Sequence, residues 1–180
     1  MPRTITINLH SPGSVKAFEK QITNYKKDLE RKARAGIHAL ADAGIEVAKA
    51  NCGEYGQFIV FSKKVNSLSG DGAKGEILAV GTPVKRLRAK MEIDMNPLLM
   101  AEFGSGFHAE VLDEVPGVGQ GTFPDQTHAF DEGGWWYVDI NTGQSHRSTG
   151  ETPTHPMHNA ALEIIRTARA VFAEVFANAK

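Results

Sequence analysis

The sequence lacks several features that would assign it to a secreted, membrane or thiolate-metal protein. Its single cysteine, Cys52, excludes an internal disulfide and a multi-thiolate metal site, and it fits a reducing compartment. No apolar run approaches the ~20 residues that span a bilayer, and the first residues lack the apolar run of a signal peptide. We therefore expect a soluble, intracellular protein that is not embedded in a membrane.

The chain also lacks an excess of charge of either sign. Its 20 Lys and Arg residues oppose 21 Asp and Glu residues, and the formal net charge is -1. Such a protein does not attract nucleic acid or an acidic membrane as a whole, so any DNA contact must be local. The length of 180 residues, with 41% hydrophobic and 23% charged residues, suits one globular domain with its own core. We predict a single domain over residues 1–180.

The strongest pattern is an apolar period of three to four residues over residues 15–47. It follows Pro12, which suits a first helical position, and it predicts a helix that ends near Ala50. At ~1.5 Å per residue such a helix is roughly 55 Å long. It is expected either to bend, with Gly36 and Gly44 as the candidate sites, or to project beyond the body of the protein.

The rest of the chain predicts short strands, loops and a second helix. Alternation or aromatic content predicts strands at residues 4–9, 57–61, 75–80, 85–95 and 135–140. Polar residues 62–74 predict an exposed loop or arm, and residues 104–134, rich in Gly, Pro and Asp, predict a long interaction loop. The helical period returns from Met157, with Thr154 as a plausible cap.

These elements define an α+β class. We expect a long N-terminal helix and a C-terminal helix that pack on a small, mostly antiparallel sheet, with long loops between the elements.

Histidines in the predicted loops raise the question of a metal site. They include His108, His128, His146, His155 and His158. The last two are spaced by one helical turn, but Pro156 lies between them and no carboxylate stands at a known zinc-motif distance. Loop histidines that make hydrogen bonds are the favoured interpretation. A small cytoplasmic metal-dependent hydrolase that uses these histidines is the alternative.

Other partial motifs are incomplete. His108 and Glu110 match half of the zinc-deaminase motif, whose paired cysteines cannot exist in a chain with one cysteine. Residues 117–121 resemble a phosphate-binding loop, but Thr122 breaks the glycine spacing and no Lys-Ser/Thr pair follows. Nothing around Cys52 marks a nucleophile. We therefore predict no enzyme, no catalytic residue, no metal ligand and no cofactor.

A nucleic-acid-binding module is a third possibility. Trp135 and Trp136 could stack on bases, with Arg86, Arg88 and Lys90 as phosphate contacts. No basic patch is interleaved with the tryptophans in the sequence. Packing of one aromatic face in the core and of the other against a second subunit is the simpler interpretation.

Three blocks of sequence, taken in order, carry a family resemblance. They are Ala-Glu-Phe-Gly-Ser-Gly at 101–106, Gly-Trp-Trp-Tyr-Val-Asp at 134–139, and Ser-Thr-Gly-Glu-Thr-Pro at 148–153, which leads through 156–160 into the last helix. In this order they resemble the head-tail joining or tail-completion proteins of long-tailed bacteriophages. Those are small α+β proteins with an E-[FY]-G-[ST]-G turn, a G-W-x-Y strand and a T-x-G-x-x-P approach to the last helix. Residues 104–134 depart from that pattern by their length and proline content.

The resemblance implies a structural protein of the phage neck. It implies a six-fold ring that joins the head connector to the tail tube and lines the conduit for DNA. The implied partners are further copies of the chain, a head connector or stopper protein, the tail tube protein and DNA that passes without sequence-specific contact. No membrane is involved. The implied location is the tail or neck of the virion, and the host cytoplasm during assembly.

The same resemblance, together with the apolar residues of the long loop, nominates a subunit or partner interface. Its candidate residues are Glu102, Phe103, Gly104, Gly106, Phe107, Phe123, Phe130, Trp135 and Trp136. Glycine at positions 104 and 106 permits a positive φ where the chain must turn sharply. Two roles stay open for Glu102: an ion pair with a neighbouring subunit, or hydrogen bonds from local backbone groups.

Overall fold

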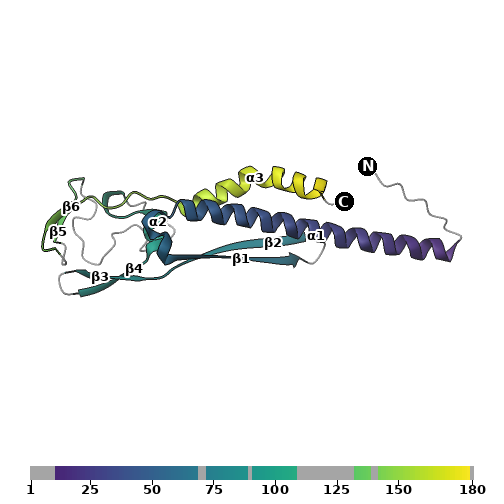
Figure 1. The fold of residues 1–180 in the computed structure, drawn as a ribbon, viewed down its shortest axis with the longest axis horizontal. Coiled ribbons are helices and arrows are strands. Elements are labelled where there is room, and N and C mark those ends of the chain that lie inside the picture. The colour runs from purple at the N-terminus through teal and green to yellow at the C-terminus, as the bar shows by residue number, and fades with distance from the viewer. Residues whose placement is uncertain (1–10, 69–71, 89–90, 109–131, 139–141, 179–180) are drawn as a thin grey trace. The chain divides into compact units, whose positions relative to one another are not determined.

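The computed structural model describes residues 11–68, 72–88, 91–108, 132–138 and 142–178 (Figure 1). In chain order the elements are α1 (Pro12–Ala50), the 3-10 helix η1 (Gly53–Phe58), β1 (Ile59–Leu68), β2 (Gly72–Gly81), β3 (Val84–Arg88), β4 (Met91–Met95), α2 (Pro97–Phe103), the 3-10 helix η2 (Gly106–His108), β5 (Trp135–Val138), β6 (Ser145–Ser148) and α3 (Pro156–Asn178). The predicted α+β class, with its long first helix, its last helix and its small antiparallel sheets, is confirmed.

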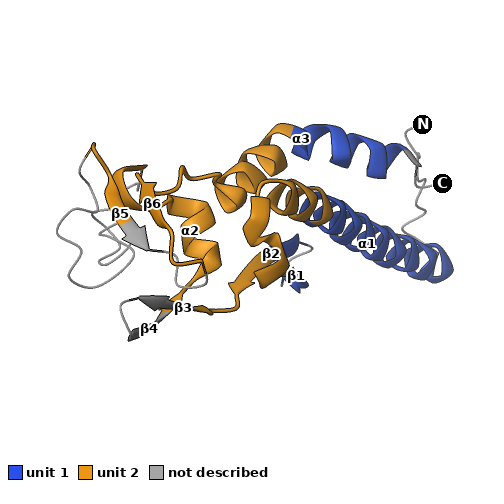
Figure 2. Cartoon of the chain, turned by 60° about the vertical axis from the view of Figure 1, so that its left-hand side comes forward, with its two compact units in different colours: residues 1–41, 64–76, 167–180 blue, residues 42–63, 77–166 orange. Residues whose placement is uncertain are grey.

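The chain divides into two compact units (Figure 2). Unit 1 comprises residues 1–41, 64–76 and 167–180, and unit 2 comprises residues 42–63 and 77–166. The single domain over residues 1–180 stays a prediction. Within the described ranges, none of the helices combines the length and apolarity needed to cross a lipid bilayer.

In unit 1 two glycines allow other elements to come close. A Cβ added to the buried Gly36 of α1 would lie 2.7 Å from Cδ1 of Phe172 in α3. A Cβ added to Gly75 of β2 would lie 2.5 Å from Cγ2 of Ile37 in α1. Such distances are far below a normal contact of ~3.5 to 4 Å, so only glycine fits at these two positions without a shift of the neighbour. At each of these two glycines, the backbone of one element therefore packs directly against a side chain of another element.

Unit 2 contains a cluster of buried apolar residues. Its members are Cys52, Tyr55, Ile59, Met95, Met100 and Ala101, which come from η1, β1, β4, α2 and the chain around them. Gly44 continues the pattern of unit 1, because an added Cβ would lie 2.7 Å from Cδ1 of Ile164 and 2.9 Å from Cδ1 of Ile77. The predicted bend sites in the first helix thus have another role. The helix continues through Gly36 and Gly44, and both glycines serve as packing sites.

The strands differ from the predictions in three places. β1 begins at Ile59, after η1, and continues to Leu68, so most of residues 62–74 form a hairpin and not a loop. Residues 85–95 form two strands, β3 and β4, paired from Val84↔Met95 to Arg88↔Met91. β6 was not predicted and pairs with β5 from Trp135↔Ser148 to Val138↔Ser145. The strands of each pair are joined by main-chain hydrogen bonds, which do not require the apolar side chains on which the predictions relied.

Some predictions lie outside the described residues. They are the strand at 4–9, the end of the strand at 135–140, and the greater part of the long loop at 104–134, including Phe123 and Phe130.

Candidate functional site

The first block, residues 101–106, forms the end of α2 and the turn that follows it. α2 begins at Pro97 after Asn96, whose side-chain Oδ1 accepts hydrogen bonds from the amides of Leu98 (3.0 Å) and Leu99 (3.4 Å). The helix ends at Gly104, where φ is 70° and the amide donates to the carbonyl of Met100 at 2.9 Å. With φ 70° and ψ -165°, Gly104 adopts a backbone conformation that is essentially restricted to glycine, and this allows the sharp turn after α2. The chain then turns into η2.

The third block lies alongside this turn and is hydrogen-bonded to it. Ser105 and Glu151 exchange two main-chain hydrogen bonds, of 2.9 and 3.2 Å, and the amide of Phe107 donates to the carbonyl of Thr149 at 2.9 Å. The amides of Thr154 (2.8 Å) and His155 (3.1 Å) both donate to the carbonyl of Ala101. Residues 101–108 and 149–155 thus form a short two-stranded contact between segments far apart in the sequence.

The glycines of all three blocks lie where the segments touch. We call this contact the clamp, defined as residues 101–108, 134–135 and 148–158. A Cβ on Gly104 (φ 70°) would lie 2.5 Å from the Glu151 carbonyl oxygen, and one on Gly106 (φ 60°) would lie 2.5 Å from Cη2 of Trp135. The positive φ predicted for these two glycines is confirmed.

Two further glycines occupy equivalent positions in the second and third blocks. A Cβ on Gly134 (φ 65°) would lie 2.9 Å from the Ser148 carbonyl carbon, and one on Gly150 (φ 97°) would lie 2.6 Å from the Ser105 carbonyl carbon. The glycines therefore bring three segments of the chain into main-chain contact.

Glu102 caps the last helix. Its carboxylate accepts hydrogen bonds from the amides of Met157 (2.7 Å) and His158 (3.0 Å), which are among the first amides of α3. Pro156, the first residue of α3, has no amide hydrogen, so these two amides are the first that need an acceptor. A carboxylate is also favoured by the positive end of the helix dipole. Of the two roles left open for Glu102, the structure shows backbone hydrogen bonds, although from residues 55 and 56 positions away.

The predicted cap of this helix, Thr154, is wrong. Its hydroxyl donates a hydrogen bond to the carbonyl of Ala101 at 3.2 Å, so Thr154 links the segment before α3 to α2. The sequence places Thr154 correctly near the helix start, but a cap from a distant carboxylate leaves no trace in the local spacing.

Two ionisable groups are shielded from solvent: Glu151, which is half-buried in the clamp, and Cys52, which is buried in the core of unit 2. The Tyr55 hydroxyl donates to the Glu151 carboxylate. Burial, followed by the negative charge of Glu54, raises the pKa of Glu151. Burial, followed by the charge of Glu102, raises the pKa of Cys52, whose thiol donates to the Ala48 carbonyl at 3.2 Å. A thiol with a raised pKa is a poor nucleophile.

The raised pKa of Glu151 predicts a pH-dependent effect of Glu151→Gln. Between the unfolded pKa of about 4.5 and the higher folded pKa, the folded state binds more protons than the unfolded state. The wild-type free energy of unfolding therefore falls as the pH rises through this range. Glu151→Gln has no carboxyl group at this position, so its free energy of unfolding does not fall for this reason. We expect the stability of Glu151→Gln relative to wild type to improve from pH 4 to pH 7, as measured by urea unfolding.

Glu163→Gln is the control for this experiment. The Arg166 side chain hydrogen-bonds to Glu163 and lowers its pKa. Its relative stability should therefore change slightly in the opposite direction, or not at all, because the pair is exposed. The same trend in both variants would show that the effect does not come from the burial of Glu151.

The structure does not gather the histidines. His108 lies 3.3 Å from the Thr149 hydroxyl through Nε2, and the rings of His155 and His158 are 6.1 Å apart in an edge-on arrangement. His146 lies in β6, and His128 is outside the described residues. Within the part of the chain that the structure describes, no three His, Cys, Asp or Glu side chains gather closely enough to hold a metal ion.

The candidate interface residues fall into two groups. Gly104 and Gly106 are buried, and Phe103 and Trp135 are half-buried. Phe107 is 44% exposed and Trp136 is 70% exposed. Only these two aromatic side chains among the described candidates are open to a partner.

The sequence blocks contain Ser105 and Glu151, but no role was predicted for either, and Tyr55 was missed; these three residues join the clamp to itself and to the core. The glycine at position 150 was the one available signal for this contact. No protein-family model, no curated protein and no solved structure matches the chain.

Proposed function

We propose that this chain is a structural protein of the neck of a tailed bacteriophage, where it assembles into a ring between the head connector and the tail tube. The observation that carries the proposal is the clamp. The three sequence blocks that resemble the head-tail joining proteins form one hydrogen-bonded unit, in which each block contacts another. If the three blocks resembled the family only by chance, they would have no reason to contact one another in the structure.

The clamp is suited to hold a surface rigid. Its glycines and Glu102 all make contacts within the chain. Their common role is to fix the path of the main chain and not to supply a reactive group. Phe107 and Trp136 extend from it and are 44% and 70% exposed. Large exposed aromatic side chains on a rigid support are typical anchors of protein interfaces.

A ring of identical subunits requires a second, different surface on each subunit. Unit 2 offers exposed apolar side chains elsewhere: Leu162 (52%) and Ile165 (74%) on α3, and Val60 (65%) on β1. In the proposed ring, the Phe107 and Trp136 surface of one subunit binds such a surface of the next. The ring is six-fold and encloses the path of the DNA.

Native mass spectrometry and negative-stain imaging of the purified full chain test this proposal. We expect a closed ring with a central opening for the wild type. Trp136→Ser should dissociate the ring, because it removes the more exposed of the two aromatic side chains that extend from the clamp. Tyr25→Ser is the matched control, since Tyr25 is 64% exposed but lies on α1 in unit 1, and this variant should keep the ring.

Two results would count against the ring. A wild-type chain that stays monomeric at all concentrations would overturn it. A metal-dependent hydrolase activity that is abolished by His155→Ala would support the alternative enzyme.

A further inference from the structure

One side of α1 carries a continuous row of basic residues. We call it the basic stripe; its members are Lys16, Lys20, Lys27, Arg31, Arg34 and His38. They are separated by three, four or seven positions, and at ~100° per residue they fall within a sector of about 60° around the helix. No acidic residue of α1 lies in that sector between its two ends. All six residues belong to unit 1.

The charges of the stripe are open to solvent. Lys16, Lys20, Lys27 and Arg34 are exposed, and among the described residues none of them has an ion-pair partner. Arg31 is also exposed and pairs with Asp28 at 2.6 Å. At least four permanent positive charges are therefore not neutralised by the described part of the chain.

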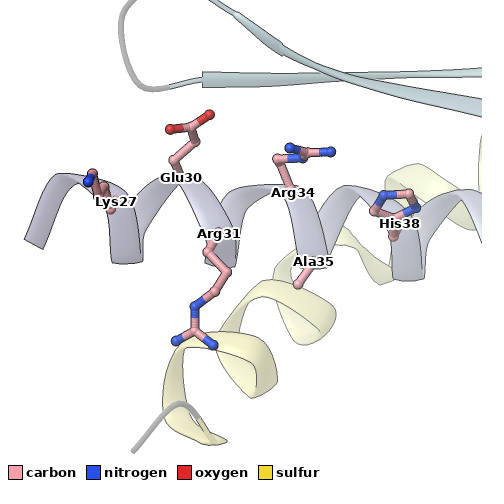
Figure 3. A pocket seen from close by; sticks show the side chains of 6 residues that line it. All are labelled: Lys27, Glu30, Arg31, Arg34, Ala35 and His38. Atoms are coloured by element: carbon pink, nitrogen blue, oxygen red, sulfur yellow. The ribbon is translucent and has the colours of Figure 1, made fainter. Parts of the chain in front are cut away.

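The middle of the stripe is slightly hollowed. Four of its members line a hollow of about 440 Å³ together with Glu30 and Ala35, and Figure 3 shows these side chains along α1. In this view Glu30 and Arg34 point to one side of the helix and Arg31 points to the other, so the carboxylate lies at the edge of the hollow on the side of Arg34 (Figure 3). The hollow offers a place where an anionic group could contact several basic side chains at once.

We propose that the basic stripe binds the phosphate backbone of double-stranded DNA without sequence specificity. From Lys16 to His38 the stripe extends about 33 Å at ~1.5 Å per residue, which matches about ten base pairs at ~3.4 Å each. Long basic side chains in a row suit phosphates, which carry no sequence information. The stripe contains no Phe, Tyr or Trp side chain that could stack on a base.

The position of the stripe argues against insertion of α1 into a membrane. The apolar residues of α1, such as Phe18, Ile22 and Gly36, lie on the side of the helix opposite the stripe. At Gly36 that side is already packed against Phe172. A helix that inserts its apolar side into a bilayer surface would leave this stripe pointing into water.

This site is distinct from the one that the sequence suggested for nucleic acid. Arg86 and Arg88 belong to β3 and not to α1, and Lys90 lies outside the described residues. The inference also does not rest on the proposed ring, since a single chain carries the whole stripe. A chain that forms rings but does not bind DNA would contradict the stripe proposal alone.

Fluorescence anisotropy with a 30-base-pair duplex of arbitrary sequence, titrated at several salt concentrations, tests the inference. Neutralising about five phosphates gives a slope of log K against log salt of roughly -4 to -5. The variant Lys20→Gln/Lys27→Gln/Arg34→Gln should reduce the slope to about -2 and lower the affinity roughly 100- to 1000-fold at 0.1 M salt. Far-UV circular dichroism checks that the variant keeps its helices.

The control variant is Lys26→Gln/Lys49→Gln/Lys64→Gln, which changes the net charge equally but leaves the stripe intact. It should bind duplex DNA like the wild type. Equal loss in both variants would assign binding to net charge and overturn the stripe. Absence of duplex binding by the wild type at low salt would overturn it as well. Binding to polyglutamate or to vesicles of phosphatidylserine, but not to the duplex, would assign the stripe to an acidic protein or a membrane.

Discussion

Replacing Gly150 by alanine is expected to lower the free energy of unfolding by about 3 kcal/mol or more. Gly150 has a φ of 97°, which an L-residue with a Cβ rarely adopts, and the added Cβ would lie 2.6 Å from the Ser105 carbonyl carbon and 2.9 Å from Cα of Gly106. Both neighbours are backbone atoms, which cannot rotate away as a side chain would. Backbone strain and steric overlap of this kind are among the few causes of such large effects. Chemical denaturation followed by tryptophan fluorescence measures the loss.

Gly143→Ala is the matched control. Gly143 also has a positive φ, of 68°, but an added Cβ would meet no atom within 4 Å. Only the intrinsic cost of the left-handed conformation applies, roughly 1 to 2 kcal/mol. If both variants lose the same stability, the close contact between Gly150 and Ser105 does not exist in solution.

Removal of the Glu102 carboxylate is expected to cost about 2 to 3 kcal/mol in Glu102→Ala. The two hydrogen bonds from Met157 and His158 are lost, and two amides at the start of α3 are left without their acceptor. Glu102→Gln keeps one acceptor oxygen but no charge, and should cost about 1 kcal/mol. Urea unfolding at pH 7 distinguishes the two values.

Glu174→Ala provides the comparison for a carboxylate on α3 that caps nothing. Glu174 is exposed, and its removal should change stability by less than about 0.5 kcal/mol. A Glu102→Ala variant as stable as Glu174→Ala would contradict the capping role.

The parts of the fold that could be predicted are those that depend on local periodicity. α1 and α3 have apolar residues at helical spacing over many turns, and both ends of α1 and the start of α3 were predicted within one residue. The hairpins were harder to predict from the sequence. The alternation of polar and apolar residues continues along the sequence from β3 into β4, so one strand was predicted at residues 85–95 where there are two.

The candidate site could be predicted only in part, because its contacts are not local. The positive φ of Gly104 and Gly106 follows from residue type and was predicted. The acceptor of the first α3 amides is Glu102, whose distance in the sequence exceeds any capping motif. The composition of the chain likewise does not reveal features that depend on how residues are arranged in space. A net charge of -1 for the whole chain says nothing about basic residues aligned on one side of a helix.

The clamp has a consequence for the order of events in folding. The hydrogen bonds between residues 101–108 and residues 149–158 of the clamp join positions 41 to 56 apart in the sequence, so the chain between them must close before any of these bonds can form. Contacts of such long sequence separation form late, after local helix and hairpin structure. Gly150→Ala and Glu102→Ala should therefore leave the refolding rate nearly unchanged and accelerate unfolding. The residues that make the clamp rigid would then determine how long the native state lasts, and not how fast it is reached.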